Sequence, residues 1–239
     1  MITGRQFSFG GRSCREFGVV CSGSGTFGAP ERDAEVVEVP GRNGSLVIDK
    51  GRYKDIQVVY PCFIPRDFQR NMAAFRAWLL SMHGYQRLED GYNPESFRMG
   101  MVTGGVSTDP APLNRGATFD VAFLCKPQRW LYIGEEEIAV SSGQELTNPT
   151  PFPAEPLITV QGSGAGVLTV GDTSVSILSM PDGVLTLDCA EQNAYGSGGA
   201  NRNNTISAPE FPRLAAGETV IRWTGDITGV KIVPRWWTI

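Results

Sequence analysis

The side chains that could perform catalysis are few, and their spacing forms none of the common catalytic or metal sites. The chain has a single histidine, His83, so we expect no multi-histidine metal site and no histidine-based triad at any other position. The five cysteines are scattered and contain no CxxC pair: Cys14, Cys21, Cys62, Cys125 and Cys189. Such a set is typical of reduced, buried thiols.

Two short segments have the residue types of a ligand-binding site but lack the local structure that such a site needs. Gly162 to Gly166 is as glycine-rich as a phosphate-binding loop, but a strand rather than a helix is expected after it, so we interpret it as a turn between two strands. Glu135, Glu136 and Glu137 could ligate a cation, but successive side chains of an extended segment point to opposite faces. We therefore expect no catalytic residue, no cofactor and no metal.

The composition favours a folded protein that assembles with other proteins. Apolar residues make up 41% of the 239 residues, which is enough for a hydrophobic core. Of the 21 basic residues only four are lysine, and the arginine that dominates is enriched at protein interfaces. A net charge of −4 without a basic cluster argues against sequence-independent nucleic-acid binding.

Neither a membrane span nor a secretory signal is expected. The sequence contains no run of 18 apolar residues. Its first residues lack a basic stretch followed by an apolar one, which a secretory signal would require.

Several strands are predicted in the first half of the chain. Residues 35–39 and 45–49 are expected to form a hairpin with a tight type I′ turn, because Asn43-Gly44 is typical of that turn. Apolar residues alternate over 56–64, where Pro61 places the strand at a sheet edge or near its end.

Two further strands are expected from alternating apolar residues. In the segment 97–101, Phe97, Met99 and Met101 alternate with Arg98 and Gly100, so we expect the three apolar side chains on the buried face. Residues 117–125 alternate in the same way.

One helix is predicted over residues 67–83. Asp67 is a suitable N-cap, Gly84 is typical of the residue after a helix, and His83 can cap the last carbonyl groups. The apolar residues of this segment form one stripe that is expected to pack against the core: Phe68, Met72, Phe75, Leu79 and Met82.

A domain boundary is expected where prolines interrupt the pattern. Residues 145–156 contain four prolines, which favours an extended connection. We therefore divide the chain into domains 1–147 and 148–239. Short strands about ten residues apart predict a β-sandwich in the second domain. The fold class is mostly β, with an α+β first domain that carries one helix.

The order and spacing of several segments resemble the distal tail protein (Dit) family of long-tailed bacteriophages. The resemblance extends over essentially the whole chain and is carried by segments that include Phe7-Ser8-Phe9-Gly10-Gly11, Val39-Pro40-Gly41-Arg42-Asn43-Gly44, Leu88-Glu89-Asp90, Leu168-Thr169-Val170-Gly171 and Phe211-Pro212-Arg213-Leu214.

The resemblance implies a structural virion protein without enzymatic activity, made in the cytoplasm of the host bacterium. It implies an N-terminal domain that forms a hexameric ring and a C-terminal domain that is a galectin-like β-sandwich. The ring would connect the tail tube protein to the tail-tip or baseplate proteins and to receptor-binding proteins. DNA would pass through the channel of the ring without specific binding.

The alternative hypothesis is a carbohydrate-binding module that contacts glycans on the host cell surface. Trp223, Trp236 and Trp237 could stack on a sugar ring. Residues 151–239 contain no histidine, however, and galectins depend on one. Packing in a core or an interface is the simpler interpretation of these tryptophans.

Overall fold

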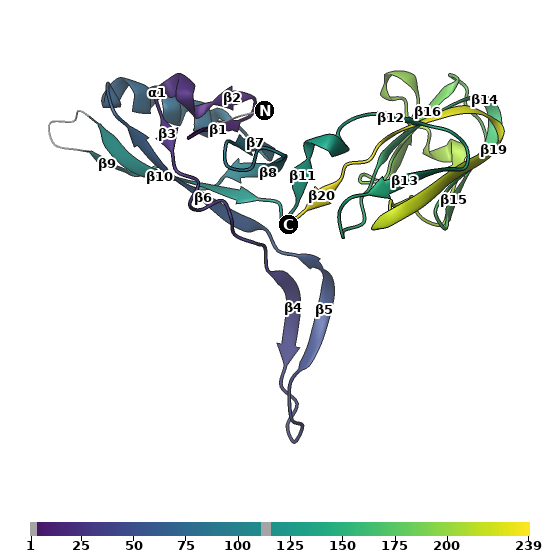
Figure 1. The fold of residues 1–239 in the computed structure, drawn as a ribbon, viewed down its shortest axis with the longest axis horizontal. Helices are drawn as coiled ribbons and strands as arrows, with labels where there is room; N and C mark the ends of the chain where they lie inside the picture. Colours follow the sequence, from purple (N-terminus) through teal and green to yellow (C-terminus); the bar gives the residue numbers. More distant parts are fainter. Residues whose placement is uncertain (1–3, 111–115) are drawn as a thin grey trace. The chain divides into compact units, whose positions relative to one another are not determined.

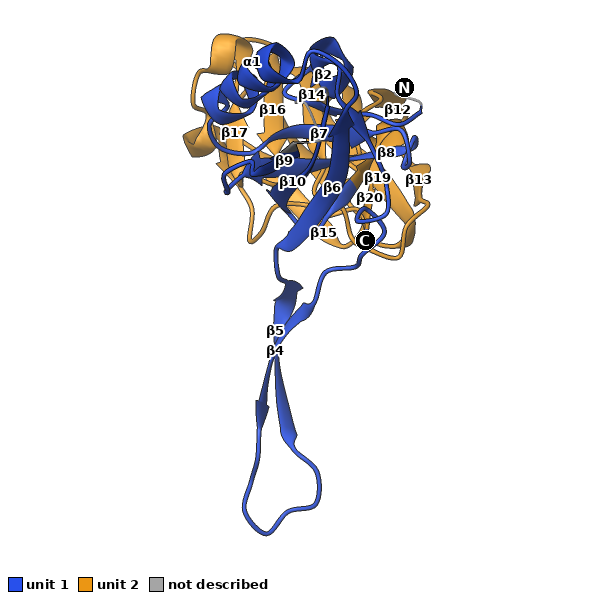
Figure 2. Ribbon diagram, turned by 90° about the vertical axis from the view of Figure 1, so that its left-hand side faces the viewer, with its two compact units in different colours: residues 1–129, 239 blue, residues 130–238 orange. Residues whose placement is uncertain are grey.

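The computed structural model describes residues 4–110 and 116–239 and has two compact units (Figures 1 and 2). Unit 1 comprises residues 1–129 together with Ile239, and unit 2 comprises residues 130–238. The division therefore lies before the expected boundary at 147/148. The reason is that β12 (Ile138–Val140) and β13 (Gln144–Asn148) both pair with β19 (Gly217–Val233) of unit 2.

The proline-rich segment also belongs inside unit 2 rather than between the units. Ala154 lies within it, is fully buried, and exchanges two backbone hydrogen bonds of 2.9 Å with Leu214. Proline prevents regular helix there, as expected, but an extended segment with one bridge to the core is not a linker.

The described residues are mostly β, as the sequence predicts, and unit 1 is built on one antiparallel sheet. Seven of its strands follow one another across the sheet in the order β2 (Arg12–Ser13), β1 (Phe7–Phe9), β7 (Gln86–Asp90), β8 (Ser96–Val102), β10 (Ala117–Cys125), β6 (Ile56–Ile64) and β3 (Val20–Cys21). A further strand, β9 (Thr108–Pro110), pairs with β10, and a short 3-10 turn, Cys14–Phe17, follows β2.

The single α-helix of the described residues, α1 (Phe68–Ser81), confirms the predicted helix (Figure 1). Met72, Phe75 and Leu79 of the predicted stripe are buried, and Phe68 and Met82 at its ends are partly buried against the same core. Trp78 is buried beside them, although it lies outside the predicted stripe. Asp67 occupies the N-cap position, but its side chain makes no capping hydrogen bond.

The helix packs on the sheet through a cluster of aromatic rings. Phe75 lies at the centre, with ring centroids 5.5 Å from Phe119, 5.6 Å from Trp78, 5.9 Å from Phe17 and 6.4 Å from Phe7. All four contacts are edge-to-face, the geometry that the ring quadrupole favours. The helix is therefore held by the same rings that form the core of unit 1.

Strand β8 follows the expected faces of residues 97–101 only at Phe97, which is buried. Arg98 and Gly100 are buried, whereas Met99 and Met101 are half-buried. The guanidinium of Arg98 donates to the carbonyl oxygens of Lys126 and Pro127, so that backbone acceptors compensate part of its burial. Hydrophobic alternation assigns arginine to solvent and cannot anticipate such acceptors.

Pro61 does not mark the edge of the sheet. Strand β6 continues through it, pairing with β10 on one side and with the two-residue strand β3 on the other. The Pro61 carbonyl accepts a hydrogen bond of 2.8 Å from the amide of Ser22, just after β3. The N and O atoms of a strand residue point to the same side. The side of β6 on which Pro61 lacks an N–H donor is therefore the side that faces the two-residue strand β3, where few ladder hydrogen bonds are needed.

Unit 2 contains one hydrogen-bonded sheet of eight strands. Its main path is β12, β19, β14 (Leu157–Val170), β15 (Thr173–Ile177) and β18 (Ile206–Ser207), while β13, β16 (Val184–Asp188) and β17 (Asn193–Tyr195) pair beside it. A short strand, β11 (Arg129–Leu131), pairs with β20 (Trp237–Thr238). Where the sequence predicts pairs of short strands, β14 and β19 are each continuous.

Gly162 to Gly166 lies within β14 and is not the expected turn. The pairing with β19 shifts register between Gln161 and Gly162, and again between Gly162 and Gly166. A Cβ atom on Gly164 would overlap the Asp226 carboxylate, and one on Gly166 would lie 2.6 Å from the Thr224 carbonyl oxygen. The glycines are therefore needed because two strands approach closely, and no helix follows that could bind a phosphate.

All five cysteines are buried and unpaired, which confirms the expectation of buried thiols. Of the helices in the described ranges, none has both the length and the apolar character of a membrane span.

We predict that Phe75→Ala destabilises unit 1 by about 3–5 kcal/mol, because it removes the central ring of the cluster. Calorimetry of the whole chain should show a lower unfolding temperature for unit 1 and an unchanged one for unit 2. Arg70→Ala, on the exposed side of the same helix, is the control and should change stability by less than about 0.5 kcal/mol. An unchanged unfolding temperature for Phe75→Ala would show that the cluster does not hold the helix.

A second pair of variants tests the close approach of β14 and β19. Gly225 and Gly217 have nearly the same positive φ, 80° and 81°, so alanine costs about 1–2 kcal/mol of backbone strain at either position. A Cβ at Gly225 would also lie 2.5 Å from the Ala165 carbonyl oxygen, whereas one at Gly217 meets nothing within 4 Å. Denaturant unfolding should therefore show a clearly larger loss for Gly225→Ala than for Gly217→Ala, and equal losses would contradict the close packing.

Candidate assembly arm

The most exposed structured segment of the chain is a hairpin in unit 1, which we call the arm and define as residues 31–54. Its strands, β4 (Arg32–Val37) and β5 (Leu46–Tyr53), pair only with each other and form a two-stranded sheet of their own. Figure 2 shows this ribbon leaving the rest of unit 1. Every residue of β5 except Tyr53 is exposed.

The hairpin was predicted, but its turn is not the expected type I′ turn. Val37 pairs with Leu46, so residues 38–45 form the connecting loop. A type I′ turn needs positive φ at both central residues, and of Asn43 and Gly44 only Gly44 has it. The loop is held by a hydrogen bond of 3.1 Å from the Arg42 amide to the Val39 carbonyl oxygen.

Both faces of the arm are apolar near its tip. Val36 lies opposite Val47 on one face, and Val37 lies opposite Leu46 on the other, where Ile48 follows. Val36 and Val47 are 64% and 61% exposed. The sequence does contain a sign of this arrangement, since Val36-Val37 and Leu46-Val47-Ile48 are consecutive rather than alternating apolar residues. Strands of this pattern are normally covered on both faces.

An isolated two-stranded ribbon of this kind has little stability in water. A two-stranded hairpin without a third strand or a packed face is marginally stable. Exposed contiguous apolar side chains on a soluble protein mark an interaction surface. The geometry of the arm therefore suits a segment that another polypeptide covers.

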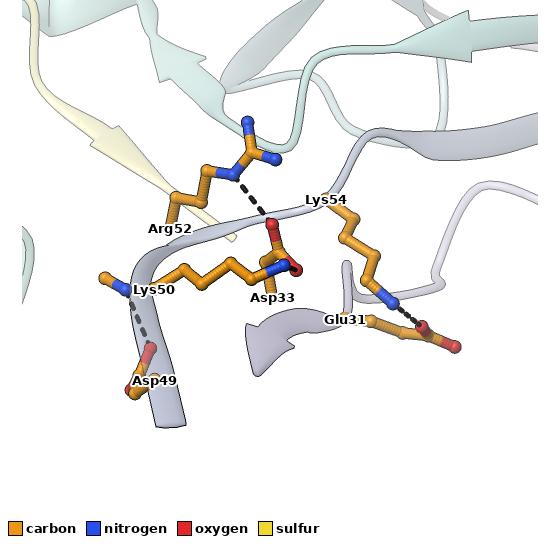
Figure 3. A network of polar contacts seen from close by, with 7 residues as sticks. Glu31, Asp33, Asp49, Lys50, Arg52 and Lys54 are labelled. Atoms are coloured by element: carbon orange, nitrogen blue, oxygen red, sulfur yellow. Dashed lines mark hydrogen bonds and ion pairs between the residues drawn. The ribbon is translucent and has the colours of Figure 1, made fainter. Parts of the chain in front are cut away.

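Charged side chains fix the base of the arm (Figure 3). Asp33 is almost fully buried and accepts a hydrogen bond of 2.8 Å from Nε of Arg52, with Nζ of Lys50 at 3.3 Å. Nζ of Lys54 lies 3.3 Å from the Glu31 carboxylate. These pairs join β4 and its approach to β5, so the two strands are clamped where they leave unit 1.

A bulge at the same level explains the position of these charges. Between the pairs Arg32–Tyr53 and Ala34–Asp49, residues 50–52 of β5 lie opposite Asp33 alone. Gly51 has φ of 71°, and its amide donates to the Asp49 carboxylate at 2.8 Å. The bulge brings both Lys50 and Arg52 to Asp33, which a regular ladder would not do.

Asp33 is the electrostatic centre of this base. The hydrogen bond from Arg52, and then the charge of Lys50, lower the pKa of the Asp33 carboxyl below its ordinary value of 3.8, although its desolvation acts in the opposite direction. The carboxylate is therefore ionised at neutral pH and attracts two cations that would otherwise repel each other.

The other candidate residues from the sequence do not come together in a site. Among the described residues no group of histidine, cysteine or carboxylate side chains could hold a metal ion. Glu137 forms an ion pair of 2.6 Å with Lys231 across β12 and β19. The His83 carbonyl oxygen accepts from the Gln86 side chain at 2.8 Å.

The tryptophans proposed for sugar stacking pack against protein instead. Trp236 is 3% exposed in the core of unit 2, and Trp223 is partly buried against that core. Trp237 stacks on Phe152 with ring centroids 4.5 Å apart, and its indole donates to the Pro153 carbonyl oxygen at 3.0 Å. The structure thus favours the packing interpretation of these residues.

Neither the known protein families nor the curated proteins provide a match to this sequence. Solved structures do. The chain superposes on the SPP1 Dit protein (gp 19.1) with a TM-score of 0.76, covering 98% of this chain and 99% of that one at 10% sequence identity. The chain has the fold of a Dit protein. SPP1 Dit is a paradigm of the hub of the adsorption apparatus in phages that infect Gram-positive bacteria.

A second likeness is to the phage P2 baseplate. In its activated conformation with Ca, one chain matches with a TM-score of 0.52 over 97% of this chain and 98% of that one, at 9% identity. The corresponding structure with Sr gives the same TM-score over 95% and 97%. The Dit fold therefore extends over both units, as the resemblance in the sequence implied.

We predict that Asp33→Asn loosens the arm. Without its charge, Lys50 and Arg52 repel each other, and hydrogen exchange of the β4 and β5 amides should become about two- to fivefold faster at pH 7. Glu35→Gln is the matched control, because Glu35 is an exposed carboxylate of the same strand.

The same measurement gives a pH dependence. Because the pKa of Asp33 is lower in the folded arm, its stabilisation is present above pH 3.8 and is lost as the pH falls through the lowered value. Protection of the arm, corrected for intrinsic exchange, should fall in that range for the wild type and not for Asp33→Asn. Equal protection in both proteins at every pH would contradict the role of Asp33.

Proposed function

We propose that this chain is the structural hub subunit of a phage tail. Six copies would form a ring at the distal end of the tail tube and connect it to the tail-tip or baseplate proteins and to receptor-binding proteins. Unit 1 would form the ring, and unit 2 would be the galectin-like domain that projects from it. The protein would have no catalytic role and would be a virion component, assembled after synthesis in the bacterial cytoplasm.

The observation that carries this proposal is the match to SPP1 Dit over the full length of both chains. A match of one unit alone would fit many β-rich proteins, because a fold by itself does not define a function. Here the superposition covers 98% of this chain and 99% of that one, so both units and the whole length take part in the match. The match to a baseplate chain supports the same role.

The arm supplies a physical reason for ring formation. Each subunit has one arm whose apolar faces would be buried by a neighbouring subunit. The arm of that neighbour is then still uncovered and can bind to the next subunit. Such a head-to-tail contact is heterologous, and it is saturated only when the rotation closes into a ring. Covering Val36 or Val47 fully would contribute about 1.5–3 kcal/mol per side chain.

The charge of the chain is compatible with DNA passing through the ring. The net charge is −4, and the arm carries as many acidic as basic residues, five of each within residues 31–54. A ring of such subunits would not hold a polyanion by phosphate contacts, which require many free cationic side chains.

We predict that Val47→Asp prevents ring closure while leaving the subunit folded. An aspartate at this position must be desolvated when the arm is covered, so the contact should weaken at least tenfold. Electron micrographs of tails assembled with the variant should lack the distal ring, whereas the unfolding temperature of the isolated protein stays unchanged, because Val47 is exposed in the subunit.

Val167→Asp is the control, since Val167 is an exposed strand valine of unit 2, and its tails should keep the ring. Wild-type tails without a ring of this protein at the end of the tube would overturn the proposed function. Rings of normal stability with Val47→Asp would leave the hub role standing and reject the arm as its contact.

A further inference from the structure

A small cavity in unit 1 lies between two buried arginines. Its volume is about 10 Å³, and Arg98, Arg129, Asp90, Asn93 and Ser96 line it. That volume is close to what a single water molecule needs. The cavity is far from the charged base of the arm in sequence, and the proposed function does not use it.

Arg98 lines this cavity and has hydrogen-bond donors without a partner. Its side chain lies on β8 and is 4% exposed. Nη1 donates to the carbonyl oxygens of Lys126 at 3.4 Å and Pro127 at 3.1 Å. Nε and Nη2 are buried and have no hydrogen-bond partner among the described residues. A buried donor without an acceptor is costly, which indicates that something absent from the protein chain occupies the space.

Arg129 brings a second positive charge to the same place. It is 9% exposed, and its guanidinium donates to the carbonyl oxygen of Thr26. Burial, and after it the neighbouring charge of Arg129, lower the pKa of Arg98 to about 10. Arg98 nevertheless remains cationic at neutral pH, because it loses its proton only near that value.

The one carboxylate that lines the cavity is already used. Asp90 accepts hydrogen bonds of 2.8 Å from the Tyr60 hydroxyl and from the amides of Tyr92 and Asn93, and one of 2.9 Å from the Asn93 side chain. No ion pair joins it to Arg98 or Arg129 within the part of the chain that the structure describes. Two buried cations thus face one buried anion, an excess of one positive charge that solvent cannot screen well.

We propose that this cavity binds one monatomic anion, a chloride ion under ordinary conditions, through Nε and Nη2 of Arg98 and the guanidinium of Arg129. The anion supplies an acceptor to the unpartnered donors and cancels the excess charge at once. A polyatomic anion such as phosphate does not fit in about 10 Å³. A water molecule fits and could accept hydrogen bonds, but it leaves the charge uncompensated.

The site has a structural consequence for unit 1. Arg129 is its last residue before the chain enters unit 2, and Thr26 precedes the arm. The Asn93 side chain donates to the Thr26 hydroxyl at 3.2 Å. A bound anion would therefore tie the approach to the arm and the end of unit 1 to strand β8.

Bromide provides the direct test, because it replaces chloride and scatters anomalously. Crystals of the full chain grown in bromide should show an anomalous peak between Arg98 and Arg129. At constant ionic strength, replacing gluconate by 100 mM bromide or chloride should raise the unfolding temperature of unit 1 by about 4–6 °C, as expected for a site that is about nine-tenths filled.

Variants show whether the effect comes from this site. Arg98→Met should abolish the halide-dependent shift, whereas Arg70→Met, at an exposed arginine of α1, should retain it in full. A wild-type crystal without an anomalous peak in the cavity, with a water molecule there instead, would overturn the proposal even if Arg98→Met does not fold. A halide shift that persists in Arg98→Met would overturn it as well.

Discussion

The apolar surface on both faces of the arm is the constraint on which the proposed assembly depends. A ribbon of two strands cannot cover Val36, Val47 and Leu46 by itself, because a hairpin has no third layer. Glu35, Glu38 and Arg42 bring charge near the tip, but the ion pairs that hold the two strands together lie at the base, where Asp33 contacts Lys50 and Arg52. The arm is thus held by ion pairs at its base, and its apolar side chains near the tip are uncovered. This arrangement suits a contact that forms only between subunits.

Unit 1 gives the arm a firm support. The segments before and after it are residues 22–30 and strand β6, and β6 lies inside the sheet that the aromatic cluster around Phe75 binds to α1. The polar cluster around Asp90 and Arg98 lies in the same unit and reaches Thr26, just before the arm. Apolar packing and buried polar contacts therefore fix the two ends of the arm by different means, one through β6 and the other through Thr26.

In unit 2, the long strands β14 and β19 stay paired over most of their length despite two register shifts. Glycines at 162, 164, 166 and 225 let β14 and β19 approach where a Cβ would collide with backbone or with Asp226. Residues 157–161 of β14 pair with β16, and residues 166–170 pair with β15. One strand then contributes to the core from both of its halves, with Ile158 near one end and Leu168 near the other.

Local patterns in the sequence predict the elements that depend on few neighbours: the helix with Met72, Phe75 and Leu79, the strands 56–64 and 117–125, the hairpin, and the buried cysteines. Periodicity reports which side of an element is apolar, and this suffices when core and solvent are the only alternatives. Tertiary structure alone decided the rest. Arg98 is buried because distant carbonyl groups accept its hydrogen bonds, and residues 162–166 form a strand because β19 lies against them. The domain division moved to 129/130 because β12 and β13 pair with a strand some 80 residues later, and the arm became a candidate interface because nothing in its own unit covers it. Each of these depends on contacts between residues far apart in the chain, which no local pattern encodes.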